Sequence, residues 1–400
     1  MVALLVGKKI MKLEKNDKFL PFGAPDIGEE EIKEVVECLK SGWLGTGPRV
    51  KLFEKNFKEF KNINNAVALN SCTSAIFLSL TELGIGPGDE VITTPMTFCS
   101  TINSIIHCGA TPVLADINIK TMNIEPEDIK NKITSKTKAI LPVHFAGRMC
   151  DMNKIMQISK KNSLYVIEDC AHAIESMYEG KNAGTIGDMG CFSFYATKNI
   201  VTGEGGMIIS KDNSRIDRIR KLALHGMSLD AWKRFGNEGY KHYSIVEAGY
   251  KFNMMDIQAS IGIHQLAKVE KNWLKRKKIW DTYQTAFKEF PFVIPSNDFG
   301  NSKHAYHLFT IRIDEKNSGI TRDEFLNKML EYNIGCGIHY TSIPAYSFYK
   351  EKYKWSEDAY PNSKIVGEQT VSLPLSPKLN DSNINYIIDV IKLIFSNKLT

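Results

Sequence analysis

Short apolar runs alternate with amphipathic segments along the first two thirds of the chain. The runs are four or five residues long and bounded by turn residues, as expected of strands buried on both faces. They cover residues 66–69, 90–94, 112–115, 139–143, 164–168, 191–194 and 207–210, with helices expected over 75–83, from about 100 and from about 152. This alternation predicts an α/β fold with a mostly parallel sheet and helices on both faces.

The pattern changes on either side of this region. An amphipathic helix over 29–40 ends at the stop signal Ser41-Gly42, and a long helix starting near 257–266 carries the chain out of the sheet. Beyond it, strands at 292–294, 308–313 and 335–340 among helices indicate a smaller α/β domain. We expect a flexible N-terminal extension over 1–18, a large domain over 19–265 and a small C-terminal domain over 266–400.

Composition agrees with a large folded chain. The 400 residues are 43% hydrophobic, enough for a sizeable core. The net charge of +6 is spread along the sequence and comes with no nucleic-acid motif, so a role in nucleic-acid binding is not indicated. The densest basic run, 271–278, is expected to be a solvated helix face.

The spacing of cysteines and the lengths of apolar runs indicate the cellular compartment of the protein. The eight cysteines include no CxxC pair and no Cys/His cluster of zinc-like spacing, so we expect no disulfides and no metal. The apolar start of the chain is too short for a signal peptide, and Met11 is the more natural first residue. No run approaches the roughly 18 apolar residues of a spanning helix, so we expect a cytoplasmic protein without a membrane segment.

The stretch CFSFYATKNIVTGEGG gives the first indication of a catalytic residue. A strand from Cys191 breaks before a single lysine, Lys198, and a glycine cluster (Gly203, Gly205 and Gly206) precedes the next apolar run. Glycines without a Cβ let a backbone turn sharply or approach a bulky group closely. A Schiff-base lysine would lie at such a strand end, although most lysines are solvated surface residues.

A second strand makes this interpretation more specific. The run 164–168 predicts a buried parallel strand followed by Asp169. Ligands of open α/β sheets bind at the carboxyl ends of strands, so Asp169 and Lys198 should face one crevice. A lysine amine and a carboxylate suit pyridoxal 5′-phosphate (PLP), because the lysine bonds the cofactor and the carboxylate keeps the pyridine nitrogen protonated.

The PLP phosphate would need an anion site. Cys72, Thr73 and Ser74 follow the strand at 66–69 and open an apolar-periodic helix. The free N–H groups at a helix N-terminus, with hydroxyls beside them, form such a site. An ordinary Ser/Thr helix cap is the alternative explanation of the same residues.

The chain resembles the DegT/DnrJ/EryC1/StrS family of PLP-dependent sugar aminotransferases, within the fold-type I (aspartate aminotransferase-like) superfamily. The likeness extends from about residue 21 to about residue 377 and rests on motifs in family order. These are SGWLGTGPRV, NSCTSAI, GDEVITTPMTF, CGATPVLADI, PVHFAGRMCDM, VIEDCAHAIES, FSFYATKNIVTGEGGM, HGMSLDAWKRF, GYKFNMMDIQASIG and AYHLFTIRI.

The resemblance implies roles for several cofactor-binding residues. Phe98 corresponds to the aromatic residue that stacks on the cofactor ring, and His172 to a Gln/His beside its phenolic oxygen. Ser193 corresponds to a hydroxyl directed at the phosphate. Core packing remains the alternative for Phe98, and a structural role the alternative for His172.

The resemblance also implies residues that meet the sugar. Trp43 belongs to the loop on the substrate side. Glu204 bonds its own loop or faces the sugar, and a solvated loop carboxylate is the alternative. His339 and Tyr340 lie near the approach of the small domain to the sugar, and residues 225–235 resemble branches that act on 4-keto sugars.

One segment implies a homodimer with shared active sites. GYKFNM resembles the stretch in which a polar residue reaches the phosphate of the partner subunit. Many family members read GYNYR there, so the departure leaves open whether Lys251 or Asn253 makes the contact. We favour Asn253.

The implied activity is transamination. Lys198 separates the chain from the subset that has histidine at that position and performs dehydration or deoxygenation. We expect an amino acid, L-glutamate, to donate its amine through PLP to a keto group, at C4, of a UDP-, GDP- or dTDP-linked deoxysugar, in cell-surface glycan or related amino-sugar biosynthesis. A cysteine desulfurase or Cys/Met lyase on the same fold stays an alternative, as does a non-enzymatic binding or regulatory protein.

Overall fold

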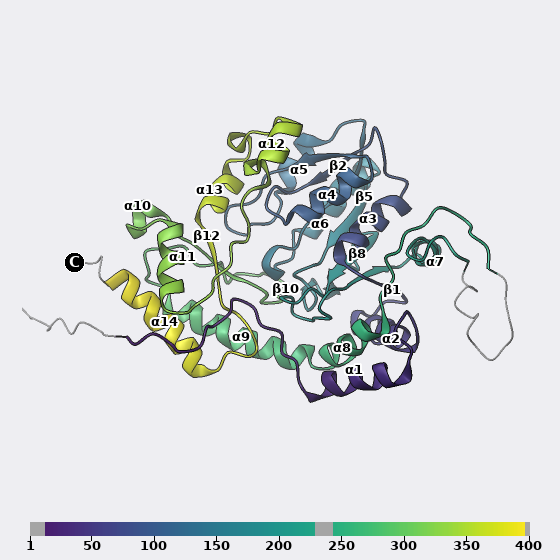
Figure 1. The fold of residues 1–400 in the computed structure, drawn as a ribbon. Helices are drawn as coiled ribbons and strands as arrows, with labels where there is room; N and C mark the ends of the chain where they lie inside the picture. The colour runs from purple at the N-terminus through teal and green to yellow at the C-terminus, as the bar shows by residue number, and fades with distance from the viewer. Residues whose placement is uncertain (1–12, 229–242, 397–400) are drawn as a thin grey trace, which may run out of the picture.

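A mixed β-sheet lies at the centre of the larger part of the protein (Figure 1). The computed structural model describes residues 13–228 and 243–396. The sheet strands are β1 (Asn65–Leu69), β2 (Glu90–Thr93), β3 (Thr111–Leu114), β4 (Thr137–Leu141), β5 (Tyr165–Asp169), β8 (Met189–Ser193) and β9 (Gly206–Ser210). Their order is β1-β9-β8-β5-β4-β2-β3, and β9 runs antiparallel to both neighbours while the other pairs are parallel. The predicted mostly parallel α/β fold is confirmed.

Helices cover both faces of this sheet. Alternate strand residues enter two different cores: Ala66 and Ala68 face one, Val67 and Leu69 the other. The first core is closed by α2 (Pro48–Lys61), α5 (Pro126–Lys132), α6 (Met152–Asn162) and α8 (Asp256–Ala267), and the second by α3 (Cys72–Glu82), α4 (Cys99–His107) and α7 (Asn213–Leu222). Burial on both faces explains why the strands read as continuous apolar runs.

An aromatic cluster anchors the strand that leads to Lys198. Phe53 and Phe57 of α2 meet Phe194 and Phe192 edge to face, with ring centroids 5.2 and 5.1 Å apart respectively. Edge-to-face contacts stabilise beyond the area they bury, by about 0.5–1.5 kcal/mol a pair. The turn carrying Lys198 therefore begins from a rigid, fully packed strand end.

The helix before the sheet forms as predicted. α1 (Glu29–Ser41) begins after Gly28, whose N–H donates to Glu31 Oε2 at 2.9 Å. It ends where Gly42 adopts the left-handed conformation, with φ of 71°. That conformation costs glycine little, so the stop signal read from the sequence has a direct physical basis.

A second hydrophobic core forms where α9 (Val269–Ala286) leaves the sheet domain (Figure 1). It is built mainly from α9, α11 (Arg322–Glu331), α14 (Asp381–Ser396), β11 (Phe309–Arg312) and β12 (Thr370–Leu373). The remaining elements are α10 (Glu315–Ser318), α12 (Ser347–Tyr353), α13 (Pro361–Gln369), β6 (Met177–Tyr178), β7 (Lys181–Asn182) and β10 (Ser302–Lys303), with 3-10 turns at Phe145–Gly147, Ile343–Ala345 and Glu357–Ala359.

The chain preceding α1 also contributes to this second core. Leu20 is buried in it, Leu13 packs against it, and the Asn16 N–H donates to the Tyr386 hydroxyl at 2.9 Å. Residues 1–12, including the expected start at Met11, lie outside the described residues. The domain boundaries at 18 and 265 stay predictions. No described helix is both long and apolar enough to cross a membrane.

Two expected strands of the smaller part are absent from the described residues. Between Pro291 and Pro295, only Val293 forms a bridge, to Arg312, because the flanking prolines offer no N–H to a ladder. In 335–340, only Gly337 pairs, with Ser372. The partner of β11 is instead β12, whose short run before Pro374 did not suggest a strand.

Glu168 ties the end of β5 to the loop before β8. Its side chain is fully buried and points away from the site that Asp169 faces. Oε1 accepts from the N–H groups of Ile186 and Gly187, and Oε2 from His144 Nε2 and Gly184 N–H, at 2.7–3.0 Å. Burial alone would raise the pKa of Glu168, but the His144 and backbone hydrogen bonds outweigh it and lower the pKa. The carboxylate is therefore charged and fully satisfied.

We predict that Glu168→Gln destabilises the fold by about 2–4 kcal/mol, because either amide orientation turns an NH₂ group toward N–H donors. Urea denaturation at pH 7 measures this. Glu59→Gln, on the exposed face of α2, is the control and should change stability by less than about 0.5 kcal/mol. Since the folded-state pKa of Glu168 is lowered, the wild-type advantage should hold above pH 5 and shrink as the pH falls through that pKa. If Glu168→Gln were as stable as Glu59→Gln, the role of Glu168 in holding the fold would be contradicted.

Candidate active site

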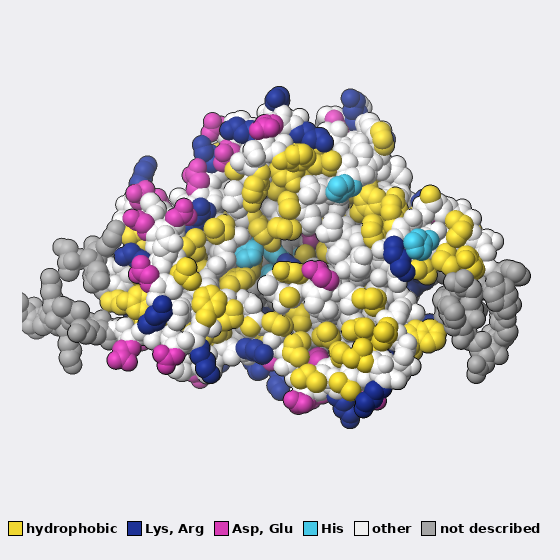
Figure 2. Space-filling view, in the orientation of Figure 1, with side chains coloured by type: hydrophobic (Ala, Val, Ile, Leu, Met, Phe, Trp, Pro, Cys, Tyr) yellow, Lys and Arg dark blue, Asp and Glu magenta, His cyan; other side chains and the backbone are white. Residues whose placement is uncertain are grey.

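Lys198 and Asp169 come together at the carboxyl edge of the sheet. β5 ends at Asp169, which lies opposite Cys191 of the parallel strand β8, and Lys198 lies in the turn after β8. The two side chains interact electrostatically, each affecting the pKa of the other. Figure 2 shows a hollow near the middle of this face of the molecule, where histidine side chains reach the surface.

Asp169 is held in place by two neighbours. Oδ1 accepts from the Ala171 N–H at 3.1 Å and Oδ2 from the Thr101 hydroxyl of α4 at 2.9 Å. Burial raises the pKa of Asp169, and these hydrogen bonds and Lys198 act in the opposite direction. Each oxygen keeps a second lone pair, so the carboxylate can accept a further hydrogen bond from a protonated ring nitrogen.

Lys198 is an unusually weak base for a lysine. Burial lowers its pKa to about 8, although the nearby Asp169 and Cys72 act to raise it. A large fraction of the amine is therefore neutral near pH 8, whereas a solvated lysine, with a pKa of about 10.4, would remain charged. Neutral amine is the form that attacks a carbonyl carbon or accepts a proton.

The predicted anion site lies in the first turn of α3. The helix starts at Cys72, three residues earlier than expected, and places Cys72, Thr73 and Ser74 in that turn. Ser71 caps the helix by accepting the Ser74 N–H at 3.1 Å. The cap thus uses one donor, while the first N–H groups of the helix have no partner within it.

Gly206 explains how this helix end sits against β9. A Cβ at position 206 would lie 2.4 Å from the Ser71 carbonyl and 2.7 Å from the Cys72 nitrogen. Only glycine leaves room for the start of α3 there. The close approach expected from the GEGG cluster is therefore between this glycine and the phosphate-site turn.

His172 and Tyr340 meet across the two parts of the protein. Tyr340 Oη lies 3.0 Å from His172 Nε2, while His172 Nδ1 accepts the Ala146 N–H at 3.2 Å. Burial, followed by the charge of Lys198, lowers the pKa of His172 well below its usual value, so the ring is neutral. Sequence reasoning placed His172 at the cofactor, but it did not pair this histidine with Tyr340.

Aromatic side chains lie beside this pair. Phe98, 58% exposed, has its ring centroid 6.1 Å from that of Tyr340. His339 Nδ1 lies 2.9 Å from the Ser372 hydroxyl, and burial together with Lys198 lowers the pKa of His339 to about 3. The exposed phenyl ring of Phe98 is available for stacking on a planar ligand.

His307 is the residue that sequence reasoning missed. Its ring centroid lies 4.4 Å from that of His172, and Lys198 affects its pKa. It stands within the AYHLFTIRI motif, but nothing in the residue pattern distinguished a site histidine from a core one. Only the folded structure, which brings His307 against His172, distinguishes it from a core histidine.

Three further predicted residues form hydrogen bonds with nearby groups of the protein. Ser193 is the last residue of β8, and its hydroxyl accepts the Tyr195 N–H at 3.3 Å. Glu204 is exposed, and only its backbone carbonyl is engaged, by Gln258 and Thr202. Trp43 donates to the Thr46 carbonyl at 3.2 Å. In the described residues, neither Glu204 nor Trp43 contacts Lys198.

The two candidates for the cross-subunit contact differ in environment. Asn253 Nδ2 donates to the Thr46 hydroxyl at 2.6 Å. The Asn253 backbone forms an antiparallel β-bridge with Leu69, which lies just before the predicted anion-site turn. Its Oδ1 is buried without a partner in the described structure. Lys251 has an exposed side chain. Residues 229–235 of the HGMSLDAWKRF stretch lie outside the described residues.

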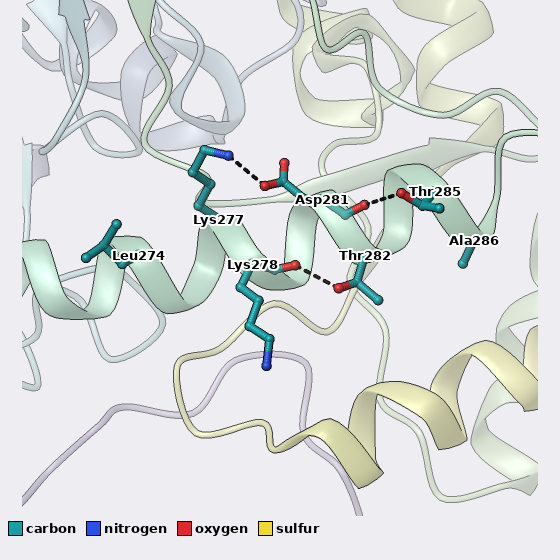
Figure 3. A pocket seen from close by; sticks show the side chains of 7 residues that line it. All are labelled: Leu274, Lys277, Lys278, Asp281, Thr282, Thr285 and Ala286. Carbon is teal, nitrogen blue, oxygen red and sulfur yellow. Dashed lines mark hydrogen bonds and ion pairs between the residues drawn. The ribbon is translucent and has the colours of Figure 1, made fainter.

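Two other features are not sites. His144, Glu168 and Cys170 bring possible ligand atoms within 4.8 Å of one another, but the carboxylate is already committed to the fold. The shallow hollow on α9 in Figure 3 contains none of the predicted site residues, and its Lys277 bonds Asp281 at 2.6 Å. The hollow lies on a solvated face of α9, as expected for the basic run 271–278, although Asn272 and Arg276 of that run are buried.

Comparisons with known proteins agree with this geometry. A model of the DegT/DnrJ/EryC1/StrS aminotransferase family matches residues 25–392. The spore coat polysaccharide biosynthesis protein SpsC of Bacillus subtilis is 45% identical over 381 residues, covering 95% of this chain and 98% of the relative.

Solved structures give the same result. A Streptococcus pneumoniae protein assigned as a sugar aminotransferase, solved in its PMP form, is 34% identical with a TM-score of 0.88, covering 94% of this chain and 99% of that one. It was also solved in a PLP form. PseC of Helicobacter pylori, an aminotransferase involved in pseudoaminic acid biosynthesis, is 28% identical with a TM-score of 0.87, covering 95% and 100% of the two chains.

The fold and the site define a fold-type I enzyme that uses PLP, since the residues offer an amine, a carboxylate and the N-terminal turn of α3 at one sheet edge. Within that class, the chain belongs to the DegT/DnrJ/EryC1/StrS aminotransferase family and is a sugar aminotransferase. The expected family, fold and cofactor are confirmed.

We predict that the apoenzyme binds PLP covalently with an initial rate that rises with pH to a midpoint near the Lys198 pKa of about 8. Growth of the visible absorbance of the bound cofactor measures the rate. Asp169→Asn should move the midpoint to lower pH, because the carboxylate raises the Lys198 pKa. The control, Asp151→Asn at the N-cap of α6, should leave it unchanged. A wild-type midpoint above pH 10 would contradict the effect of burial.

Proposed function

We propose that the enzyme moves an amino group from an amino acid, L-glutamate, to the C4 keto group of a nucleotide-linked (UDP-, GDP- or dTDP-) keto-deoxysugar. The observation that carries the proposal is Lys198 itself: it retains a reactive amine at the sheet edge, with Asp169 beside it, in a chain of the sugar aminotransferase family. An amine and a buried carboxylate are what transamination requires there.

PLP supplies a carbonyl carbon for the amine and a ring that accepts electrons. Asp169, buried and fixed by Thr101, would hold the ring nitrogen protonated. The first turn of α3 would hold the phosphate through the N–H groups of Cys72 and Thr73 and the hydroxyls of Thr73, Ser74 and Ser193. Lys198, with its lowered pKa, would take a proton from the substrate carbon and return it to the adjacent one.

The sugar side would be formed by residues from both parts of the chain. We assign Phe98 to stacking on the cofactor ring, where its exposed face is available, and His172 to the phenolic oxygen. His339 and Tyr340 would face the sugar from the smaller part, and Trp43 and Glu204 from the exposed loops. The names of SpsC and PseC support a role in cell-surface polysaccharide or related amino-sugar biosynthesis. We propose that the reaction takes place in the cytoplasm.

A cysteine desulfurase is a weaker candidate. Such an enzyme needs a thiolate that can reach the cofactor. Burial raises the pKa of Cys72, the cysteine in the anion-site turn, well above its ordinary value, so this thiol stays protonated.

We predict that the enzyme, given L-glutamate and a panel of UDP-, GDP- and dTDP-linked 4-keto sugars, aminates at least one of them, as read by mass spectrometry. Lys198→Ala should abolish turnover and the borohydride-sensitive absorbance of the bound cofactor. Asp169→Asn should keep that absorbance but lose activity by roughly a hundredfold, because the ring nitrogen would no longer be held protonated. Release of sulfide from cysteine without amination of any sugar would overturn the proposal.

We also propose a homodimer with shared sites, and an exposed apolar face supports it. Ile32, Val36 and Leu39 of α1 are 50%, 40% and 53% exposed, at the spacing of one helix face, and Leu44 follows in the adjacent loop. Figure 2 shows hydrophobic side chains gathered over the region where Figure 1 places α1 and α8. Contiguous apolar patches of this kind mark interaction surfaces. A two-fold axis would make any exchange of residues reciprocal.

We predict that inactive Lys198→Ala and inactive Asn253→Ala chains regain activity when mixed, because one site of the mixed dimer would combine an intact Lys198 with an intact borrowed Asn253. Random exchange with one active site per mixed dimer gives up to roughly a quarter of the wild-type rate. The assay is the amination reaction after subunit exchange verified by tag pull-down.

Matched mixtures separate the alternatives. Lys198→Ala mixed with Asp169→Asn, both lesions lying in one chain's own site, should regain nothing beyond the residual Asp169→Asn rate. If the Asn253 mixture stays inactive after verified exchange, the same mixture with Lys251→Ala decides whether Lys251, the exposed candidate, is the borrowed group. Inactivity of both mixtures would exclude sharing through this segment.

A further inference from the structure

A chain of polar side chains runs behind Lys198, from α9 to the histidine pair of the site. Arg276 Nη2 is ion-paired with Glu175 Oε1. Glu175 Oε2 accepts from Asn199 Nδ2 at 2.8 Å, and Asn199 Oδ1 lies 2.9 Å from His307 Nδ1. Asn199 directly follows Lys198 in the chain, so the network holds the same turn that carries the reactive amine.

Three members of this network are shielded from water. Arg276, Glu175 and His307 are only 1%, 2% and 5% exposed. Charges removed from water are tolerated only with good partners, and breaking such a pair leaves an uncompensated charge. Arg276 Nε and Nη1 are buried without a partner among the described residues, so the ion pair with Glu175 is the contact that compensates the guanidinium charge.

The partners of Asn199 determine the position of the proton on His307. Asn199 Nδ2 faces two groups that can only accept, the Glu175 carboxylate and the Ala305 carbonyl at 3.1 Å. The amide orientation is therefore unambiguous, and Oδ1 must face His307. His307 Nδ1 consequently carries the hydrogen and Nε2 the lone pair. Burial, followed by Lys198, lowers the His307 pKa well below its usual value, so the ring is neutral.

The same reasoning gives the opposite tautomer for His172. Its Nδ1 accepts the Ala146 N–H, so its hydrogen is on Nε2 and is donated to Tyr340 Oη. The Tyr340 O–H hydrogen must then point away from His172, as a donor available to another group. The two imidazole rings lie 4.4 Å apart at an angle of 37°, so His307 restricts the plane in which His172 can lie.

We propose that His307, held by Asn199, Glu175 and Arg276, is a positioning residue that fixes the ring plane of His172, and through it the Tyr340 hydroxyl, beside the turn of Lys198. The inference rests on the site assigned under the proposed function and adds to it a residue from the smaller part of the chain. Arg276, on the helix joining the two parts, thereby becomes part of the support of the site.

The test compares two histidines of one segment. His307→Phe keeps a ring against His172 but removes the donor to Asn199. His304→Phe is the matched control: His304 is also buried, and its Nδ1 accepts the Tyr306 N–H at 2.8 Å, but it packs on Trp280 and Phe299 and contacts neither Asn199 nor His172. We expect His307→Phe to lower kcat about tenfold with little change in KM, since displaced groups cost rate more than binding, and His304→Phe to leave kcat within about twofold.

A second measurement needs neither activity nor cofactor. In ¹⁵N-histidine-labelled apoenzyme, long-range couplings show which ring nitrogen is protonated, and the signals are assigned by those lost in the His307→Phe and His172→Gln variants. We expect the Nδ1–H form for His307 and the Nε2–H form for His172. The proposal is overturned if His307 carries its hydrogen on Nε2, or if His307→Phe behaves as His304→Phe does. Wild type that aminates no sugar would instead contradict the proposed function and leave the tautomer result standing.

Discussion

Burial of ionisable groups at the carboxyl edge of the sheet is the constraint on which the site depends. Removing Lys198 from water lowers its pKa to about 8, and removing Asp169 raises the pKa of that carboxyl. The two effects bring both pKa values closer to neutral pH. The attraction between the two charges limits how far each pKa shifts. A surface lysine and aspartate at the same separation would remain a charged pair and would exchange protons poorly near neutrality.

The strand register gives neighbouring carboxylates different functions. Glu168 and Asp169 are consecutive in β5, so their side chains point to opposite faces. Glu168 enters the buried side, where it accepts three hydrogen bonds from the loop before β8 and a fourth from His144. Asp169 points to the other face, and each of its oxygens can accept one further hydrogen bond. Glu168 thus holds the carboxyl end of β5 in place one residue before Asp169, the carboxylate that we propose for the chemistry.

The smaller part of the chain contributes side chains that contact His172. Tyr340 reaches His172 from beyond β11, and His307 packs its ring on the same histidine. Arg276 extends this contact into α9 through Glu175 and Asn199. These contacts between segments of the two cores lie close enough to Lys198 for it to affect the pKa of both His172 and His307.

The local signals in the sequence were sufficient for the sheet, the start and end of α1, and the pairing of Lys198 with Asp169. Each depends on a short-range property: apolar runs of strand length, glycine after a helix, and polar residues where parallel strands end. The motifs added the family, and with it the expected roles of His172, Phe98 and the anion-site turn.

Other features are decided only by the tertiary structure. The pattern placed Arg276 on a solvated face, yet its partner Glu175 lies 101 positions earlier in the chain and turns it inward. His307 reads as a core residue until its ring meets His172, and β12 pairs with β11 although its run gives no strand signal. A sequence pattern records which residues are apolar and how they are spaced. It does not record which distant polar groups become partners, because that choice is made by packing between segments far apart in the chain.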